Sequence, residues 1–212
     1  RIDGNLDDWG RAWQTSLKMS TASAVTGGLP TPQQSSVIMR ALWDANNVYL
    51  AAYVYDDEIH VDTPGQPWHD DGMEISFDPA HDHLNQTPDD DRQYTISADG
   101  SQFLWGQPTT GLEIARQLTA DGYTLEIRIP KHRMPSLKLQ AGGIAGFNFN
   151  LIDDIDGGTG ETRLFWTGDK TSRPQANWGQ IRFSAIDAET QVSPETPTPT
   201  PTPTATVTPT PS

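Results

Sequence analysis

The chain has 212 residues, a formal net charge of -14 at pH 7 and no cysteine. Such a charge argues against a nucleic-acid binder, which needs a basic patch to meet phosphate, and against docking on an anionic membrane. The absence of cysteine excludes disulfides, thiolate zinc sites and cysteine nucleophiles. No apolar run is long enough to span a bilayer, so we expect no membrane insertion. Neutral ligands such as glycans and cations such as Ca²⁺ remain compatible with this composition.

Short strands separated by turns account for most of the chain. Residues 1–13 suit a turn at Asp3 and Gly4, with Leu6 and Trp9 as anchors to a core. Residues 14–36 are polar and contain two successive glycines and two prolines, so we expect a loop. A short helical turn is expected at residues 131–137. Alternating or continuous apolar runs predict strands at residues 37–43, 48–55, 73–78, 92–98, 102–105, 112–118, 123–129, 144–152, 163–167 and 179–183.

This pattern predicts an all-β fold, an antiparallel β-sandwich of jelly-roll-like form, because no long amphipathic helix interrupts the strands. Beyond about residue 193, proline at nearly every second position blocks both helix and sheet. We therefore expect a sandwich domain over residues 1–184 and a disordered Pro/Thr-rich linker over residues 185–212. Such a spacer usually joins modules outside the cell, so we expect a secreted or cell-surface protein tethered to a further module. The alternative is a frayed terminus without a function.

One stretch concentrates the candidate binding chemistry. From Met73 to Asp78 apolar and polar residues alternate strictly, which indicates a half-buried strand. Just before it, Trp68 lies in a polar segment that contains two prolines and a glycine. A large aromatic beside a strand that presents carboxylates is a common way to hold a sugar ring. The alternative is that Trp68 only caps the end of the core.

Several sequence blocks, taken in order, resemble the family 9 carbohydrate-binding modules. The resemblance spans roughly residues 2–183, and its most distinctive block runs from Trp68 to Pro79. The other blocks are residues 2–9, 41–44, 48–50, 54–57, 92–94, 122–130, 146–150, 164–168 and 178–179.

The resemblance implies a β-sandwich that holds the reducing end of a glycan between two tryptophans, Trp68 and Trp166. It implies that Glu74 accepts hydrogen bonds from sugar hydroxyls and that Arg92 donates to them. The expected ligand is a plant-type polysaccharide or oligosaccharide end, similar to cellulose or xylan, and the expected role is to target an attached enzyme to it. The module itself is expected to be a monomer.

Strand alternation leaves a second arrangement open for two of these residues. Arg92 shares its side of the strand with Tyr94, so it must lie beyond the edge of the core to reach a ligand. Trp166 shares its side with Leu164, which would bury its indole and turn Phe165 outward.

Calcium is the cofactor that the resemblance implies, as a structural ion. Acidic residues cluster at several turns, and hard cations prefer several oxygen ligands. No cluster has the spacing of an EF-hand loop. We take Asp56, Asp57 and Asp70 as the candidate ligands; solvated surface charge is the alternative for any single cluster.

Signatures of catalysis are weak. The chain has neither the Gly-x-Ser-x-Gly elbow of hydrolases nor the His-Glu-x-x-His motif of metallohydrolases. The pair His81 and His83 is more typical of solvated loop residues than of a metal site. We therefore expect a non-catalytic module. The alternatives are an adhesion or spacer sandwich without a sugar site and, less readily, a haem-binding domain of the same fold.

Overall fold

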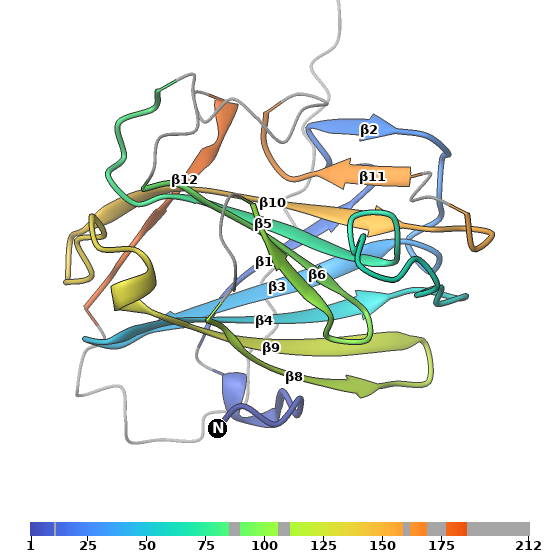
Figure 1. Ribbon diagram of the computed structural model, residues 1–212, viewed down its shortest axis with the longest axis horizontal. Coiled ribbons are helices and arrows are strands. Elements are labelled where there is room, and N and C mark those ends of the chain that lie inside the picture. Colours follow the sequence, from blue (N-terminus) through green and yellow to red (C-terminus); the bar gives the residue numbers. More distant parts are fainter. Residues whose placement is uncertain (11, 85–89, 106–110, 159–161, 169–176, 186–212) are drawn as a thin grey trace, which may run out of the picture.

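The computed structural model describes residues 1–10, 12–84, 90–105, 111–158, 162–168 and 177–185. In this part of the chain two antiparallel sheets lie face to face, which confirms the predicted all-β sandwich (Figure 1). The described residues form two 3-10 helices, η1 (Asp7–Trp9) and η2 (Lys131–Arg133), but no α-helix. Among them, no helix has the length and apolar character needed to cross a membrane. The predicted disorder of the tail concerns residues that lie almost entirely outside the described ranges.

The five-stranded sheet has the strand order β1-β3-β4-β9-β8. The seven-stranded sheet has the order β2-β11-β10-β5-β6-β7, and β12 pairs with the first half of β10. The strands of the five-stranded sheet are β1 (Trp13–Lys18), β3 (Ser36–Trp43), β4 (Asn47–Tyr55), β8 (Glu113–Leu118) and β9 (Gly122–Pro130). Those of the seven-stranded sheet are β2 (Ala24–Thr26), β5 (Gly72–Asp78), β6 (Arg92–Ser97), β7 (Gln102–Leu104), β10 (Ile144–Asp153), β11 (Thr162–Phe165) and β12 (Gly179–Arg182).

The core lies between the sheets and follows the alternation of the sequence. Met73, Ile75 and Phe77 of β5 are fully buried and belong to one cluster with Leu50 of β4 and Ile127 of β9. Burying a side chain of this size contributes about 1.5–3 kcal/mol to folding. The side chains between these core residues therefore point away from the core. Each sheet thus has an outer face on which a ligand could bind.

The prediction that residues 14–36 form a loop is wrong, because this segment contains most of β1 and the whole of β2. Both lie at sheet edges, where a strand needs main-chain pairing on one side only. In β1, Leu17 is fully buried whereas Trp13 is 46% exposed, so the alternation of apolar residues that marks the inner strands is missing. The helical turn at residues 131–137 is shorter than expected and ends at Arg133.

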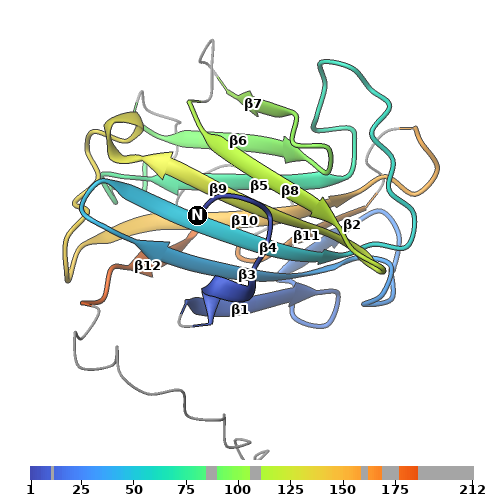
Figure 2. The ribbon, with the colours of Figure 1, turned by 90° about the horizontal axis from the view of Figure 1, so that it is seen from below.

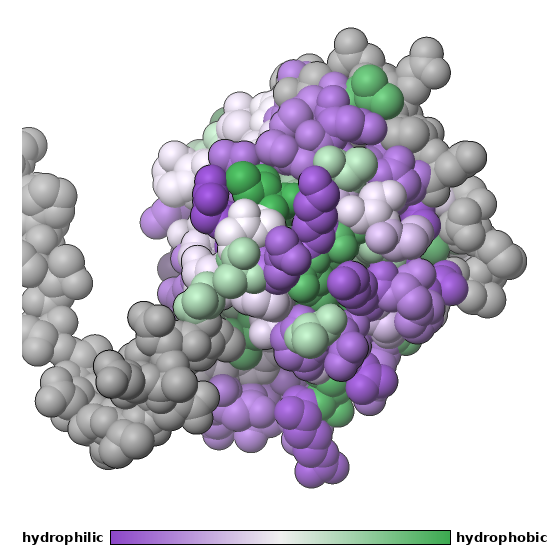
Figure 3. All heavy atoms as spheres, turned by 90° about the vertical axis from the view of Figure 1, so that its left-hand side faces the viewer, coloured by the Kyte–Doolittle hydropathy of each residue, from purple (hydrophilic) through white to green (hydrophobic). Residues whose placement is uncertain are grey.

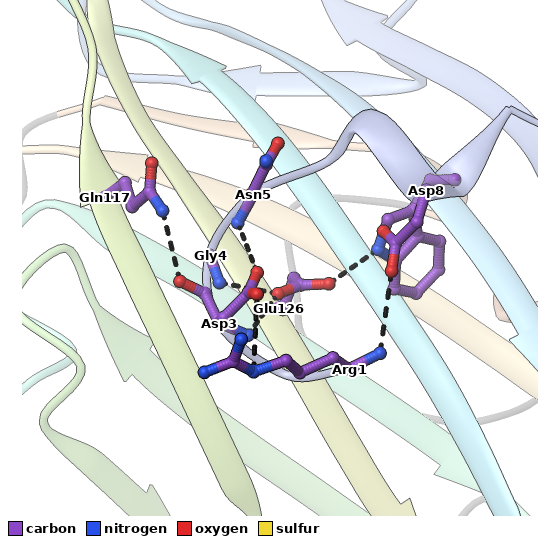
Figure 4. A network of polar contacts seen from close by, with 8 residues as sticks. Arg1, Asp3, Gly4, Asn5, Asp8, Gln117 and Glu126 are labelled. Carbon is purple, nitrogen blue, oxygen red and sulfur yellow. Dashed lines mark hydrogen bonds and ion pairs between the residues drawn. The ribbon is translucent and has the colours of Figure 1, made fainter.

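The N-terminal segment crosses the outer face of the five-stranded sheet (Figure 2). Its anchor is Glu126 of β9, which is completely buried. One carboxylate oxygen accepts hydrogen bonds from the backbone N–H groups of Asp3 (2.7 Å) and Gly4 (2.5 Å), and the other accepts from the indole N–H of Trp9 (2.6 Å) (Figure 4). The part of this outer face around Glu126 is thus covered by the chain itself.

The end of the sandwich at the left of Figure 1 presents mainly hydrophilic residues, with small and separate apolar patches (Figure 3). It includes η2 and the turn between β3 and β4. The described residues of this end form no broad apolar surface. The expectation of a monomer stays a prediction.

Candidate carbohydrate-binding site

A row of side chains crosses the outer face of the seven-stranded sheet. Cross-strand pairing aligns Phe165 of β11, Asn150 of β10, Glu74 of β5, Thr95 of β6 and Phe103 of β7. Although they face away from the core, the first four are at most 2% exposed. A buried polar group without a partner costs about 1–3 kcal/mol, and within the row Asn150 and Glu74 are paired with each other whereas the hydroxyl of Thr95 has no partner among the described residues. The row is therefore a packed face with a polar centre rather than an ordinary solvated face.

Glu74 has partners from two other strands. Asn150 donates its side-chain N–H to one carboxylate oxygen (3.1 Å), and the guanidinium of Arg163 lies 3.3 Å from the other. Arg163 precedes Phe165 by two residues on β11, so both project to the same side as Glu74. The buried negative charge is thereby neutralised by an arginine that is itself 23% exposed at its side chain.

Arg163 also fixes the loop that precedes β5. Its second terminal nitrogen donates to the backbone oxygen of Trp68 (2.7 Å). The hydroxyl of Ser97, which is fully buried, donates to the backbone oxygen of Pro67 (3.4 Å). The loop therefore lies against the polar face, and a charged donor holds the backbone of Trp68.

The indole of Trp68 stands at the β7 edge within a cluster of aromatic rings. Its centre lies 5.1 Å from Phe103, nearly perpendicular, and 5.2 Å from Trp105, tilted by 40°. His69 lies 5.9 Å away. Trp68 is partly exposed and does not belong to the core cluster, so it does not cap the core. The surrounding rings restrict its orientation, and Trp105 remains 38% exposed.

The other two predicted sugar contacts lie elsewhere. Arg92 pairs with Phe77 on the core side of the sheet, and its guanidinium donates to the backbone oxygens of Arg133 and Asp91, both at 2.7 Å. Trp166 packs at the edge of the core, where its indole stacks on Phe149 at 5.3 Å. The structure therefore brings Trp68 and Glu74 together but gives Arg92 and Trp166 different neighbours.

Four residues at this site were not among the predicted contacts: Asn150, Arg163, Phe103 and Trp105. Asn150 could have been found, because it lies between Phe149 and Leu151 and so points away from the core. The others depend on how distant strands pair, which the alternation within one strand does not reveal.

Buried carboxylates gather at the end of the sandwich where β4 and β10 end and β5 begins. Asp56, Asp71 and Asp153 bring carboxylate oxygens within 4.8 Å of one another, and all three residues are buried. Burial, reinforced by nearby carboxylates, raises the pKa of Asp56 to about 7 and that of Asp71 to about 8. The nearby His60 lowers the pKa of Asp56, but its effect is smaller than that of burial. A hard dication with oxygen ligands fits this acidic group, because such an ion would offset the mutual repulsion.

Two further groups have the same character. Asp62, Asp70 and Asp154 adjoin the first group through neighbouring residues, and Asp78, Asp90 and Asp91 lie at the other end of β5. Both carboxylate oxygens of Asp91 are buried without a hydrogen-bond partner among the described residues. Burial and the charge of Asp78 raise the pKa of Asp91 to about 8.

The predicted ligands Asp56 and Asp70 fall into two adjacent acidic groups, whereas Asp57 is exposed and belongs to none of the three. Asp71, Asp153 and Asp154 complete these groups and were not predicted. Asp153 and Asp154 approach Asp71 and Asp70 because β10 pairs with β5.

Comparison with known families decides what kind of domain carries this face. The sequence model described as "Carbohydrate family 9 binding domain-like" matches residues 2–184. The chain belongs to this family. The resemblance inferred from the sequence blocks is thereby confirmed, and the sandwich is that of a carbohydrate-binding module.

Similar proteins include longer polysaccharide-degrading enzymes. An endo-1,4-beta-xylanase A of Thermotoga neapolitana is 27% identical over 184 residues, which is 85% of this chain and 17% of that protein. Exoglucanase XynX of Acetivibrio thermocellus is 27% identical over 166 residues, which is 78% of this chain and 14% of that protein. The chain thus spans less than a fifth of the length of these relatives.

Solved structures of family 9 modules share the fold. A module from Caldicellulosiruptor kristjanssonii in complex with cellotriose matches with a TM-score of 0.74 at 20% identity, covering 93% of this chain and 95% of that one. The module in complex with glucose matches with a TM-score of 0.73 at 20% identity, covering 88% and 93%.

Proposed function

We propose that the outer face of the seven-stranded sheet beside Trp68 binds the end of a β-1,4-linked glucan or xylan chain. One observation carries the proposal: Arg163 is held by the carboxylate of Glu74 and by the backbone oxygen of Trp68, so a partly exposed charged donor is fixed to the loop that carries the indole. The related modules that were solved with cellotriose and glucose, and the xylanases among the relatives, support this class of ligand.

The exposure of the side chains indicates which of them a sugar can contact. Trp68 and Arg163 are partly exposed, so a sugar meets these two groups first: its C–H groups pack on the indole and its hydroxyls accept from the guanidinium. Glu74 is 2% exposed and acts mainly by holding Arg163 in position. Contacts of Arg92 and Trp166 with the ligand stay predictions, since both residues have other partners in this structure.

The domain acts, in this proposal, as a non-catalytic module of a larger carbohydrate-active enzyme. The Pro/Thr-rich residues 185–212 would be the tether, and the enzyme would be secreted or displayed at the cell surface. The relatives support this arrangement because this chain matches only a small part of each of them. A spacer sandwich of the same fold would have no need for the buried polar row and its arginine.

We also propose that Ca²⁺ stabilises the fold at the acidic groups. The ion would be held mainly by Asp56, Asp71 and Asp153, next to Asp62, Asp70 and Asp154. It would neutralise carboxylates that burial otherwise keeps protonated near neutral pH.

Calorimetric titration with cellotriose and xylotriose tests the sugar site. Trp68→Ala should weaken binding by about 2 kcal/mol, as expected for a buried aromatic contact, with little change in thermal midpoint. Tyr53→Ala is the control, because Tyr53 is a partly exposed aromatic residue on the outer face of the five-stranded sheet. If the parent protein binds neither sugar, or if Trp68→Ala binds as the parent does, the proposed site is wrong. Borohydride-reduced sugars then show whether the reducing end is required.

A further inference from the structure

The loop that follows β5 is held by a single residue, Asp78. Its backbone oxygen accepts a hydrogen bond from the N–H of His81 (3.2 Å). One of its carboxylate oxygens accepts from the N–H of Asp82 (3.3 Å), and the other accepts from the N–H of His83 (3.1 Å). Asp78 is fully buried, so it fixes the backbone of both histidines relative to the sheet.

Both histidines have a left-handed backbone, with φ of 56° at His81 and 55° at His83. Among the described residues, they are the two non-glycine residues with positive φ. This conformation is unfavourable for a residue with a side chain and persists only where the surroundings impose it. The hydrogen bonds to Asp78 impose it here, and the consequence is that two imidazoles two residues apart turn towards each other.

The relative position of the rings departs from that of a linear hydrogen bond. The two Nε2 atoms are 2.9 Å apart, while the ring centres are 4.3 Å apart with an angle of 65° between the planes. A linear N–H···N hydrogen bond of this length would separate the ring centres by about 5 Å. The shorter separation shows that the contact is bent, an arrangement in which both nitrogen lone pairs can meet at a point beside the line that joins them.

A metal ion at that point has an acceptable geometry. With metal–nitrogen bonds of about 2.0–2.1 Å, a nitrogen separation of 2.9 Å corresponds to an angle of about 90° at the metal. Ring centres would then be about 4.5 Å apart, close to the 4.3 Å observed. An angle near 90° suits the tetragonal nitrogen and oxygen coordination of Cu²⁺ better than the tetrahedral coordination of zinc.

We propose that His81 and His83 form a two-imidazole chelate for a divalent transition metal, with Cu²⁺ the preferred ion. The pair is accessible, because His83 is exposed and His81 is partly exposed. Acidic residues around it, Asp78, Asp82, Asp90 and Asp91, concentrate cations near the loop. Imidazole nitrogen selects transition metals, whereas calcium prefers the oxygen ligands of the acidic groups. The site is therefore distinct from the proposed calcium sites.

The site is also distinct from the sugar site, because it lies after the C-terminal end of β5, whereas Trp68 precedes its N-terminal end. Copper binding should therefore leave cellotriose binding unchanged.

Calorimetric titration of the full chain with CuCl₂, in excess Ca²⁺ to saturate the oxygen-rich sites, tests the chelate. We expect one equivalent of Cu²⁺ to bind and to give an electron paramagnetic resonance spectrum with two nitrogen donors. His81→Gln and His83→Gln should each weaken binding at least about tenfold. His132→Gln, which changes an exposed histidine of η2, should bind as the parent does.

Equal copper affinity in the parent and in the double variant would overturn the proposal, as would no binding to the parent. Either result would mean that the two rings only share a proton. Thermal midpoints of the variants establish that they are folded. The cellotriose affinity of the double variant should equal that of the parent, which would show that the copper site and the sugar site are independent.

Discussion

Two buried glutamates face outward from opposite sheets, and their surroundings differ in kind. Glu74 of β5 and Glu126 of β9 each precede an isoleucine near the middle of a strand that leads to a proline. Glu126 is satisfied by fixed donors, two backbone N–H groups and the indole N–H of Trp9. Glu74 is satisfied by two side chains, Asn150 and Arg163.

The difference shows how one sequence pattern serves two purposes. Around Glu126 the N-terminal segment completes the hydrogen bonding and shields the carboxylate from solvent, so this residue contributes to the stability of the fold. Around Glu74 the partners are side chains that can rearrange, and Arg163 remains partly exposed. A buried carboxylate therefore marks a binding site only when its partners are mobile groups that also reach the surface.

Glu126→Gln should produce the largest effect. The amide has one N–H₂ group, which must face either the indole N–H of Trp9 or the two backbone N–H groups, and none of these donors can reverse its role. We expect the free energy of unfolding to fall by about 3 kcal/mol, with cellotriose affinity unchanged. Chemical denaturation measures the first and calorimetry the second. A variant as stable as the parent would mean that the N-terminal segment does not close this face.

In contrast to the two glutamates, the buried carboxylates of Asp56, Asp71 and Asp153 have one another as neighbours. Because the folded-state pKa values of Asp56 and Asp71 are raised to about 7 and about 8, the folded protein without Ca²⁺ holds protons that the unfolded chain releases. In EDTA, the free energy of unfolding should therefore fall, by on the order of 3 kcal/mol, as pH rises from about 4 to about 8. Excess Ca²⁺ should abolish this fall.

Two substitutions locate the calcium effect. Asp71→Asn should remove most of the difference between EDTA and Ca²⁺, whereas Asp57→Asn should leave it intact because Asp57 is exposed and outside the acidic groups. Thermal midpoints that do not respond to EDTA at any pH would contradict the calcium proposal.

A pair of arginines distinguishes the two outer faces. Arg163→Met keeps the length of the side chain but removes the donors beside Trp68, so cellotriose binding should weaken by about 2 kcal/mol. Arg128→Met is the control on the five-stranded sheet, where Arg128 pairs with Glu113 at 2.5 Å. Calorimetry of both variants shows which outer face binds the sugar. If only Arg128→Met weakens binding, the sugar site lies on the five-stranded sheet.

Glu74→Gln should have the smallest effect on stability. The amide oxygen can accept from Arg163, and Asn150 can reverse its own amide to accept from the new N–H₂ group, although it then loses the long hydrogen bond (3.4 Å) that its Oδ1 accepts from Asn148. We expect a loss of less than about 1 kcal/mol in unfolding free energy and about 1 kcal/mol in sugar binding. Denaturation that shows a loss as large as that of Glu126→Gln would mean that the two glutamates have the same structural role.

The fold could be predicted from the sequence because its inner strands are buried on one face and alternate accordingly. β1 and β2 could not, since edge strands are held by backbone pairing that leaves no mark on side-chain polarity. Trp68 and the outward direction of Glu74 were both predictable from a single segment of chain. The partner of Glu74 was not, because Arg163 lies 89 residues away and reaches it only after β11, β10 and β5 have paired.

The acidic groups show the same limit. Asp56 and Asp57 are indistinguishable in sequence, but only the first points inward at the end of β4. Whether an acidic residue joins a buried group depends on which strand ends meet, and that is a property of the sheet order rather than of the local sequence.

The indole N–H signals of the tryptophans offer the most direct test of the central claim, that sugar binds the outer face of the seven-stranded sheet. Trp68 reports on that face, and Trp9 reports on the five-stranded sheet, where it lines a cavity of about 490 Å³ with Tyr49 and Arg128. During a titration with cellotriose followed by ¹H–¹⁵N correlation spectra, the Trp68 signal should shift and the Trp9 signal should stay in place. A shift of Trp9 with Trp68 unmoved would place the sugar on the opposite sheet and contradict the account.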